Sequence, residues 1–492
     1  MRLPILLYFT LQLGFLTAQT FNLNLDNNNN LELWQSMYDN QSNNSIVVMG
    51  MSGNFEFASE GLYYQQYAYN GALLNSITYG EAGLKYYGGV VVHDESGNDY
   101  CIYQVTDTTV SEFYFYNGEI IIFKINEEGI LWTNTIIDTL HIEATLSAIV
   151  ENDTLYMTGF RNYQPEQHTS TFLYKISPTG DSLALFTYSH PDWNFIGNKI
   201  IRAQNGDFLI AGYAMDGFER DRLLLRIAPN GDLLWYQIYP GEDYVAGTYD
   251  AFMDIIELED GNLIAAGRYT DYLFQNANLV KLNAAGEIIW DMSWGEENND
   301  WFEAMELRND TLFLGGNWRS GFESGYIDAW ITAMDTAGNV YWSHTYKPDG
   351  IPDNAADDYL YDFTLTGDGG MAFCGWSRRE TQDAWVMKLD ANGLCDTASC
   401  FPDLVNIYQN VLQGNPTPRV YPNPADDFIF IQSAITKNVA VQIWNIHGSL
   451  VLENKLAGNI TSLNITHLPS GIYAARFISD GEIFGEQMFV VE

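Results

Sequence analysis

The chain has 492 residues and a formal net charge of −41, from 63 acidic and 22 basic side chains. This charge repels a phosphate backbone, which excludes nucleic acid as a partner. Aromatic residues make up 15% and charged residues 17%, and the 42 glycines favour strands and turns, so the composition predicts an all-β protein.

Residues 1–18 have the features of a secretory signal peptide. Arg2 precedes an apolar run that ends at Leu16, and Ala18 provides a small residue for cleavage. We expect the mature chain to begin at Gln19. A retained membrane anchor is the alternative, but the run is short for a span, and no later segment has about eighteen uninterrupted apolar residues. The sequence therefore predicts no transmembrane span in the mature protein.

A hairpin pattern repeats through residues 19–400. Each copy has an apolar strand, a polar turn with a glycine and, in four copies, a tryptophan four residues or fewer beyond the turn, as in "NLVKLNAAGEIIW". The seven turn glycines, 51 to 58 residues apart, are Gly71, Gly129, Gly180, Gly231, Gly286, Gly338 and Gly393. We expect Trp132, Trp235, Trp290 and Trp342 to pack between neighbouring units.

A second hairpin, as in "GNLIAAGRYT", alternates with the first. Two hairpins in each unit of about fifty residues predict a seven-bladed β-propeller of four-stranded blades over residues 19–400. The repeats resemble the tryptophan-docking repeats of quinoprotein and outer-membrane-assembly propellers. That resemblance covers the blade pattern and implies no activity.

Charged residues recur at fixed distances from the turn glycine. Five residues before it stand Lys124, Lys175, Arg226, Lys281 and Lys388, and ten residues before it stand Glu119, Asp221, Asp328 and Asp383. Recurrence in several blades indicates a role in the scaffold.

Three carboxylates in the first strands of the later blades are candidate ligand-binding residues. Counting back from the next turn places Asp254, Glu303 and Asp362 at one level, with Lys199 at the same place in the preceding blade. First strands line the channel of a propeller, so these side chains are candidates to meet a cation, with calcium as the candidate cofactor, or a sugar hydroxyl. Alternatively, they are solvated or paired between blades. Trp193 and Trp301 suit a sugar ring, although packing explains them equally well.

The four cysteines show no metal-ligand spacing. Cys395 and Cys400 are close enough for a small loop-closing disulfide, whereas Cys101 and Cys374 are interpreted as buried thiols. The histidines are scattered, and no catalytic constellation is recognisable.

The tripeptide "DTL" and its relatives recur. They resemble the Asp-Ser/Thr-apolar acceptor sites of periplasmic O-glycosylation in Bacteroidota. The alternative is that Asp and Thr are ordinary hairpin residues. The matching acceptors are Thr139, Thr154, Ser182, Thr311, Thr336 and Thr397.

Residues 401–417 read as a linker, and residues 418–492 begin with "VYPNPADD" and continue through "IWNIHGSLV" and "LPSGIY". These segments resemble the type A C-terminal sorting domain of the type IX secretion system in Bacteroidota. The resemblance implies an Ig-like β-sandwich, although the final strand lacks the lysine that members often carry and Asn445 stands where aspartate is common. The motif positions are Pro422, Asn423, Pro424, Gly448, Gly471 and Tyr473.

Together these features predict a secreted or cell-surface propeller that the type IX secretion machinery exports. Its own activity is best interpreted as non-catalytic binding of an extracellular glycan or protein. A polysaccharide hydrolase or lyase that uses the channel carboxylates is the first alternative. A structural component of the cell surface is the second.

Overall fold

The computed structural model describes most of residues 19–491 in segments separated by gaps. The described residues are 19–25, 31–53, 61–81, 84–107, 119–136, 141–163, 168–217, 219–241, 248–271, 274–295, 299–319, 325–348, 357–378, 382–395, 403–404, 409–413, 418–421, 425, 428–432, 439–445, 448–456, 460–479 and 482–491. These residues form strands, turns and connecting segments, and no helix occurs among them. The predicted signal peptide lies outside them.

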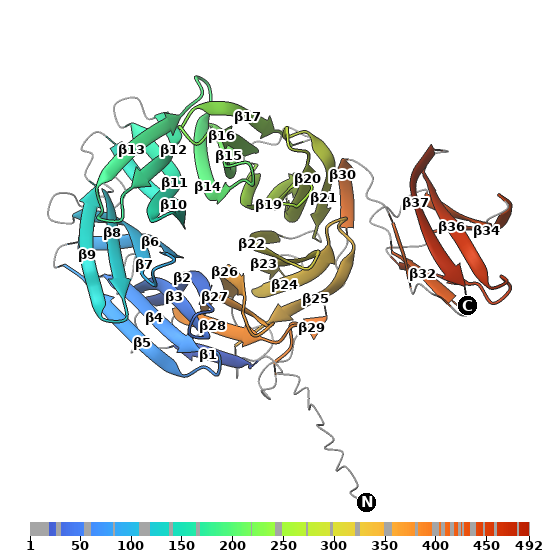
Figure 1. Ribbon diagram of the computed structural model, residues 1–492, viewed down its shortest axis with the longest axis horizontal. Coiled ribbons are helices and arrows are strands. Elements are labelled where there is room, and N and C mark those ends of the chain that lie inside the picture. The colour runs from blue at the N-terminus through green and yellow to red at the C-terminus, as the bar shows by residue number, and fades with distance from the viewer. Residues whose placement is uncertain are drawn as a thin grey trace, which may run out of the picture.

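Seven antiparallel sheets form a ring, so the predicted seven-bladed propeller is confirmed (Figure 1). Blade 1 contains β2 (Leu31–Asn40), β3 (Ser45–Gly53), β4 (Leu62–Ala68) and β5 (Leu73–Tyr79). Blade 2 contains β6 (Leu84–His93), β7 (Asp99–Asp107), β8 (Glu119–Asn126) and β9 (Gly129–Ile136). Blade 3 contains β10 (His141–Glu151), β11 (Thr154–Tyr163), β12 (His168–Ile176) and β13 (Ser182–Tyr188).

Three further blades follow the same pattern. Blade 4 contains β14 (Asn194–Arg202), β15 (Phe208–Asp216), β16 (Glu219–Ile227) and β17 (Leu233–Tyr239). Blade 5 contains β18 (Ala251–Glu257), β19 (Leu263–Asp271), β20 (Phe274–Leu282) and β21 (Ile288–Trp294). Blade 6 contains β22 (Trp301–Arg308), β23 (Thr311–Arg319), β24 (Ile327–Asp335) and β25 (Val340–Tyr346). The first strand of each blade contacts the first strands of its neighbours and so faces the central channel.

The seventh blade combines both ends of the propeller sequence. It contains β26 (Asp358–Leu365), β27 (Met371–Arg378) and β28 (Gln382–Leu389), and its outer strand is β1 (Phe21–Leu25) from the N-terminal end. Lys388 on β28 is fully buried and donates to the Asp368 carboxylate at 2.8 Å and to the Gln19 carbonyl at 2.8 Å. The seventh predicted hairpin therefore lacks a second strand of its own, because β1 takes that place and closes the ring.

The hydrophobic core is divided into clusters between blades. Each large cluster of the propeller draws its members from two adjacent blades, such as Trp294 of blade 5 and Trp330 of blade 6. A four-stranded sheet has two apolar faces, so stacking neighbouring blades buries both.

Turn glycines allow this close stacking. Gly180, Gly286 and Gly393 have φ between +73° and +90°, and a Cβ there would lie within 3.2 Å of the ring of Trp132, Trp235 or Trp342 in the preceding blade. These three tryptophans therefore pack between blades, as the sequence predicted.

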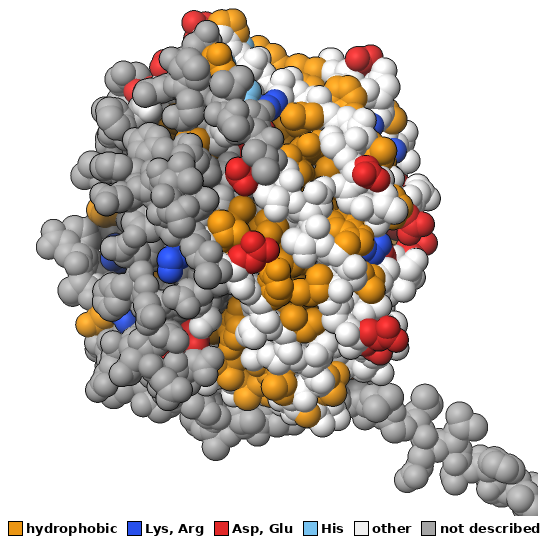
Figure 2. Space-filling model, turned by 90° about the vertical axis from the view of Figure 1, so that its left-hand side faces the viewer, with side chains coloured by type: hydrophobic (Ala, Val, Ile, Leu, Met, Phe, Trp, Pro, Cys, Tyr) orange, Lys and Arg blue, Asp and Glu red, His pale blue; other side chains and the backbone are white. Residues whose placement is uncertain are grey.

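The recurrent cations also serve the scaffold. Lys124 and Arg226 pair with Asp94 and Asp207 in the first hairpin turn of their own blades, as Lys388 does with Asp368. The rim of the disc carries exposed apolar side chains on its outer strands, including Leu74 of β5 and Leu131 of β9, and Figure 2 shows hydrophobic side chains gathered along one side of the rim.

Two short strands lie within the predicted linker. β29 (Asp403–Leu404) pairs with β25, and β30 (Gln409–Gln413) pairs with β21, so this segment extends the outer edges of blades 6 and 5. Where the structure describes it, the predicted linker therefore belongs partly to the propeller.

The C-terminal residues form a small Ig-like β-sandwich. One sheet contains β31 (Arg419–Tyr421), β32 (Phe428–Gln432) and β35 (Ile460–Asn464), and the other contains β33 (Val439–Asn445), β34 (Leu450–Lys455), β36 (Gly471–Ser479) and β37 (Glu482–Val491). Their inner faces share one buried cluster that includes Ile429, Ile443 and Phe477.

Because ring closure depends on the Lys388–Asp368 pair, we predict that Asp368→Asn lowers the free energy of unfolding by about 3 kcal/mol, since it leaves a buried ammonium without its counter-charge. Urea denaturation measures the effect. Asp260→Asn is the matched control, because exposed Asp260 holds the same place before the turn glycine of blade 5. The control should change stability by less than about 0.5 kcal/mol. Equal effects of the two substitutions would contradict the closure role.

Candidate ligand-binding channel

The first strand of every blade has a β-bulge at mid-length. The register shifts between Phe252 and Asp254 in β18, for example, and the other six first strands shift at corresponding places. An extra residue at a bulge bends the strand and re-aims its side chain. The bulge residues that line a cavity in the channel are Gln35, Gly89, Leu146, Asn198, Met253, Glu303 and Tyr361.

A glycine on the second strand makes room for the bulge. A Cβ on Gly267 would lie 2.0 Å from the carbonyl oxygen of Ala251, and equivalent glycines in five other blades meet first-strand carbonyls at 1.8 to 2.1 Å. These glycines end the apolar strand of the second hairpin in the sequence repeat, as Gly267 does in "NLIAAG". They are a sequence signal for the bulge that the turn-based alignment did not use.

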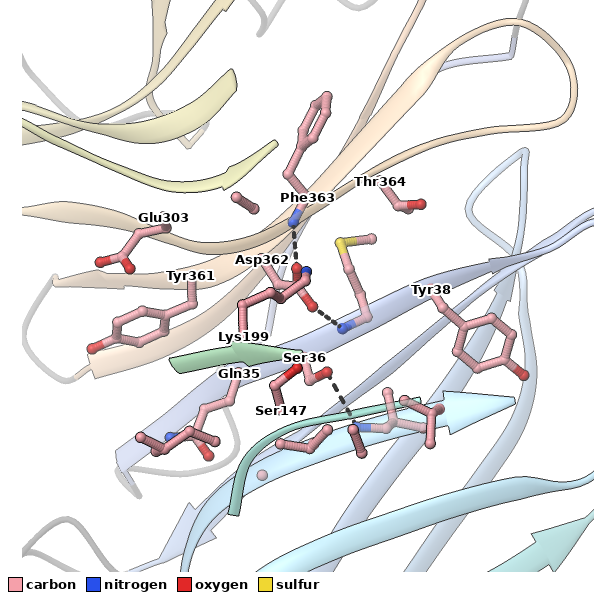
Figure 3. Close-up of a pocket in the computed structure, with 18 of the residues that line it drawn as sticks. Gln35, Ser36, Tyr38, Ser147, Lys199, Glu303, Tyr361, Asp362, Phe363 and Thr364 are labelled. Atoms are coloured by element: carbon pink, nitrogen blue, oxygen red, sulfur yellow. Dashed lines mark hydrogen bonds between the residues drawn. The ribbon is translucent and has the colours of Figure 1, made fainter. Parts of the chain in front are cut away.

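The residue after the bulge binds the next blade. Asp254 Oδ2 accepts the backbone N–H of Met305 at 2.9 Å, and Asp362 Oδ2 accepts that of Met37 at 2.8 Å. Ser147 and Ser36 do the same with Ile200 and Val91, both at 3.2 Å. Figure 3 shows the bonds from Asp362 and Ser36. We call these residues, together with Lys199, the channel belt, because they link consecutive first strands around the channel.

Lys199 is the cation of the belt. Its Nζ lies 3.2 Å from Asp254 Oδ2, and the carboxylate of Asp254 is almost fully buried. Asp254 also accepts the N–H of Ile255 at 2.7 Å, and Asp362 accepts that of Phe363 at 2.9 Å. Burial raises the pKa of Asp362 to about 6, against the opposing charge of Lys199. Asp254 and Asp362, which the sequence predicts as candidate ligand-binding residues, are therefore both paired within the scaffold.

Glu303 lies one position away from the predicted level. In blade 6 the residue equivalent to Asp254 is Ala304, and Glu303 is the bulge residue. The first hairpin of blade 6 turns through only Asn309 and Asp310, both with positive φ, whereas blade 5 has a longer turn containing Gly261. Counting back from turns of different length shifted the alignment by one residue.

This shift gives Glu303 a different environment from the belt aspartates. It lines the cavity, accepts a hydrogen bond from Trp301 Nε1, and lies 3.8 Å from the Arg268 guanidinium. Burial raises the pKa of Glu303, while Arg268 and the Trp301 bond oppose that shift. Its side chain is thus mostly buried in the channel wall, with 11% of its surface exposed.

An aromatic stack supports the channel next to Glu303. Tyr359 stacks on Trp376 with ring centroids 4.5 Å apart and lies 6.1 Å from Trp301. Trp376 Nε1 donates to the hydroxyl of Tyr361 at 3.1 Å, and Tyr361 lines the cavity beside Glu303 (Figure 3). Trp301 is thus a supporting residue behind the wall. Trp193 lies elsewhere and packs against the core between blades 3 and 4.

Glu306 is a cavity residue that the repeat alignment missed. It lines the cavity three residues after Glu303 on β22, and no hydrogen bond or ion pair of its carboxylate occurs among the described residues. Burial raises the pKa of Glu306 to about 7, and the charges of Asp254 and Asp362 add to this shift while Lys199 opposes it.

The cavity has a volume of about 490 Å³, within the usual range for small-molecule sites. Its lining combines Lys199, Glu303, Glu306 and Asp362 with apolar and aromatic side chains. In the described part of the chain, no group of three or more His, Cys, Asp or Glu side chains is arranged to hold a metal ion. The geometry suits hydrogen bonding and stacking with a polar organic ligand.

Residues 419–492 match the family of the secretion system C-terminal sorting domain. This part of the chain is a type IX sorting domain. Export through that system delivers the propeller to the cell surface or beyond it.

The structure explains three of the sorting-motif positions. Gly448 has φ of +74° in the turn after β33, Gly471 begins β36, and buried Tyr473 donates its hydroxyl to the Pro469 carbonyl at 2.6 Å. Pro422, Asn423 and Pro424 lie outside the described residues.

Several solved structures are similar in fold to this chain. They include PorZ, a surface component of the type IX secretion system of Porphyromonas gingivalis, at 10% identity over 91% of this chain and 68% of PorZ, with a TM-score of 0.34. The β-propeller domain of the Trilobed protease from Pyrococcus furiosus matches at 10% identity over 74% and 94%, with a TM-score of 0.41. The α-L-arabinofuranosidase Arb93A from Fusarium graminearum matches at 8% identity over 65% and 99%, with a TM-score of 0.42. No curated protein matches the chain in sequence.

The remaining predicted sites fall partly within the described residues. Cys395 is in a disulfide, but Cys400 lies outside, so their pairing stays a prediction; Cys101 and Cys374 are buried free thiols. Among the glycosylation candidates Ser182 is exposed, whereas Thr154, Thr311 and Thr336 are half-buried, and Thr139 and Thr397 lie outside. The described residues also contain no helix long and apolar enough to span a bilayer.

Glu306 gives a pH-dependent prediction. Its pKa is raised from 4.5 to about 7, so between these values the folded chain holds more protons than the unfolded chain, and stability falls as pH rises. Glu306→Gln removes this loss. The variant should melt at a higher temperature than the parent at pH 8 and at the same temperature at pH 4.

The control for this prediction is Glu259→Gln in the exposed first turn of blade 5, which should change melting little at either pH. A Glu306→Gln variant that is no more stable than the parent at pH 8 would contradict the proposed burial of this carboxylate.

Proposed function

We propose that the chain is a secreted, non-enzymatic binding propeller that takes an extracellular glycan into the channel mouth at blades 5 to 7. The observation that carries this proposal is the arrangement of Glu303 and Tyr361. The two bulges turn a carboxylate and an aromatic ring into the same end of a 490 Å³ cavity. A carboxylate accepts sugar hydroxyls, and an aromatic face packs against the apolar face of a sugar ring.

The contacts that Glu303 and Tyr361 make with their neighbours support a preformed site. Trp301 and Arg268 hold the Glu303 carboxylate, and Trp376 holds the Tyr361 hydroxyl. Side chains fixed before binding lose little conformational entropy on binding, which raises affinity. A preformed mouth should therefore bind a glycan more tightly than a flexible surface that makes the same contacts.

Binding is favoured over hydrolysis by the state of the belt aspartates. A glycosidase needs one carboxyl as acid and a second as base or nucleophile. Asp254 and Asp362 instead accept backbone N–H groups of neighbouring blades, and Asp254 also pairs with Lys199. These contacts support a structural role for two of the three carboxylates on which the catalytic alternative depended, and they leave only Glu303 of the three without a backbone partner in the next blade.

The domain limits and the export route complete the proposal. Residues 1–18 act as a signal peptide, residues 19–400 supply the propeller, and residues 418–492 engage the type IX machinery. Removal of the sorting domain, followed by release or surface attachment, is part of this route.

The test is a glycan array and a panel of polysaccharides, applied to the secreted chain with its propeller intact. We expect binding to at least one glycan without release of reducing ends or unsaturated products. Glu303→Gln and Tyr361→Ala should each weaken that binding roughly tenfold or more, because each removes a contact with the sugar.

Trp193→Phe is the matched control, since Trp193 packs outside the cavity and its substitution should leave affinity unchanged. Product release from any polymer would support the hydrolase or lyase alternative instead. Glycan binding that survives both channel substitutions would place the site elsewhere on the propeller. Absence of both glycan binding and product release would favour a protein ligand or a structural surface role.

A further inference from the structure

A second polar network lines the same cavity at blades 1 and 2. The Asp99 carboxylate is 5% exposed and accepts hydrogen bonds from the hydroxyls of Tyr38 and Tyr64, the latter at 2.7 Å. His93 Nδ1 lies 2.8 Å from Asp99 Oδ1 and 3.1 Å from the Tyr38 hydroxyl. The His93 ring stacks on Tyr38 with centroids 5.1 Å apart. One carboxylate thus holds three side chains from two blades.

This network fixes the orientation of His93. Because Nδ1 faces a carboxylate, it carries the proton, and Nε2 is the nitrogen left for other partners. The side chain of His93 remains 28% exposed, and both His93 and Tyr38 line the cavity. No hydrogen bond of Nε2 occurs among the described residues, so Nε2 is the ring atom that we assign to a ligand.

The network lies towards the other end of the first strands from the proposed mouth, because His93 is the last residue of β6. Met37 lies level with Asp362, since its backbone N–H donates to the Asp362 carboxylate, and Tyr38 follows it on β2. Tyr38 is three residues beyond the bulge residue Gln35, which corresponds to roughly 10 Å along a strand. Figure 3 shows Glu303 and Tyr361 together at one end of the view and Tyr38 at the other. One continuous cavity includes all of them.

We propose that His93 and Tyr38 form a second subsite of the glycan-binding channel, at the other end of the cavity, so that the ligand is an oligosaccharide lying along the channel. This inference rests on the proposed function. Glu303 and Tyr361 hold one sugar at the mouth, and His93 Nε2 donates no proton but accepts one from a hydroxyl of a sugar further along the channel. A single sugar ring does not span the two sets of residues.

The alternative role of the network is to join blades 1 and 2. Two substitutions separate the roles, because each replaces the imidazole with an amide that lies near only one of its two nitrogens. Asn at position 93 places an amide near the former Nδ1 and retains the bond to Asp99, whereas Gln places its amide near the former Nε2. A joining role requires the first contact, and ligand binding requires the second.

The experiment measures calorimetric affinity of the full secreted chain for gluco-, xylo-, manno- and galacto-oligosaccharides, from monosaccharide to tetrasaccharide. For the parent we expect affinity to rise with length in at least one series. His93→Asn should leave monosaccharide affinity and melting temperature unchanged and weaken the longer oligomers roughly three- to tenfold. His93→Gln should retain more of the length dependence than His93→Asn.

Four results would overturn the inference, and they are distinguishable. Parent binding that does not depend on length removes the second subsite but leaves the mouth intact. Equal affinity of parent and His93→Asn for all lengths assigns His93 to the scaffold alone, as does loss of binding only together with loss of stability. Absence of binding to every series contradicts the proposed function and the subsite with it.

Discussion

The belt of hydrogen bonds around the channel is the constraint on which the rest of the propeller depends. Each first strand has a bulge residue that lines the channel, and in four of these strands the next residue bonds to the neighbouring blade. Ser36, Ser147, Asp254 and Asp362 then accept a backbone N–H across the junction. Bulged strands leave such donors without ladder partners, and a buried unpaired donor is costly. At these four junctions the belt satisfies the donors and fixes the level of one first strand against the next.

The outer parts of the blades follow from this inner ring. Second-strand glycines such as Gly267 give the bulge carbonyls room, and third-strand turns place Gly286 against Trp235 of the preceding blade. The ring of blades is closed in blade 7, where β1 pairs with β28 and buried Lys388 binds Gln19 and Asp368. The ring is therefore held at three radii: the belt, the aromatic cores between blades and the outer turns.

Much of the fold followed from sequence periodicity, because each blade repeats the same local pattern. The turn glycines and the alternating hairpins located the blades, and the "YPNP" to "LPSGIY" motifs located the sorting domain. The origin of the last strand was hidden, since pairing of β1 with β28 joins residues more than 350 positions apart. The strands of the predicted linker were also missed, because β30 is stabilised by the edge of β21.

The site was predicted less well, for physical reasons that particular residues make clear. Asp254 and Asp362 were correctly placed on first strands, but sequence does not show whether a carboxylate meets a ligand or a backbone N–H. Glu303 was shifted by the two-residue turn at Asn309 and Asp310. Arg268, Tyr361 and the Tyr38–His93–Asp99 network depend on contacts between blades, which leave no fixed spacing in the chain. The bulge glycines were the one local signal for the channel-facing residues.

Export and the proposed binding then divide between the two parts of the molecule. The sandwich is the sorting domain for export, while the propeller has a channel whose proposed mouth is built from blades 5 to 7. The strongly acidic surface is consistent with solubility outside the cell and with a neutral ligand.

The central claim is that the channel mouth is the binding site, and a crystal structure of the chain with a bound oligosaccharide tests it most directly. The account predicts a sugar ring packed on Tyr361 with a hydroxyl bound to Glu303, while Asp254 and Asp362 keep their backbone partners. A sugar bound outside the channel, or one whose reacting bond lies between Asp254 and Asp362, would contradict it.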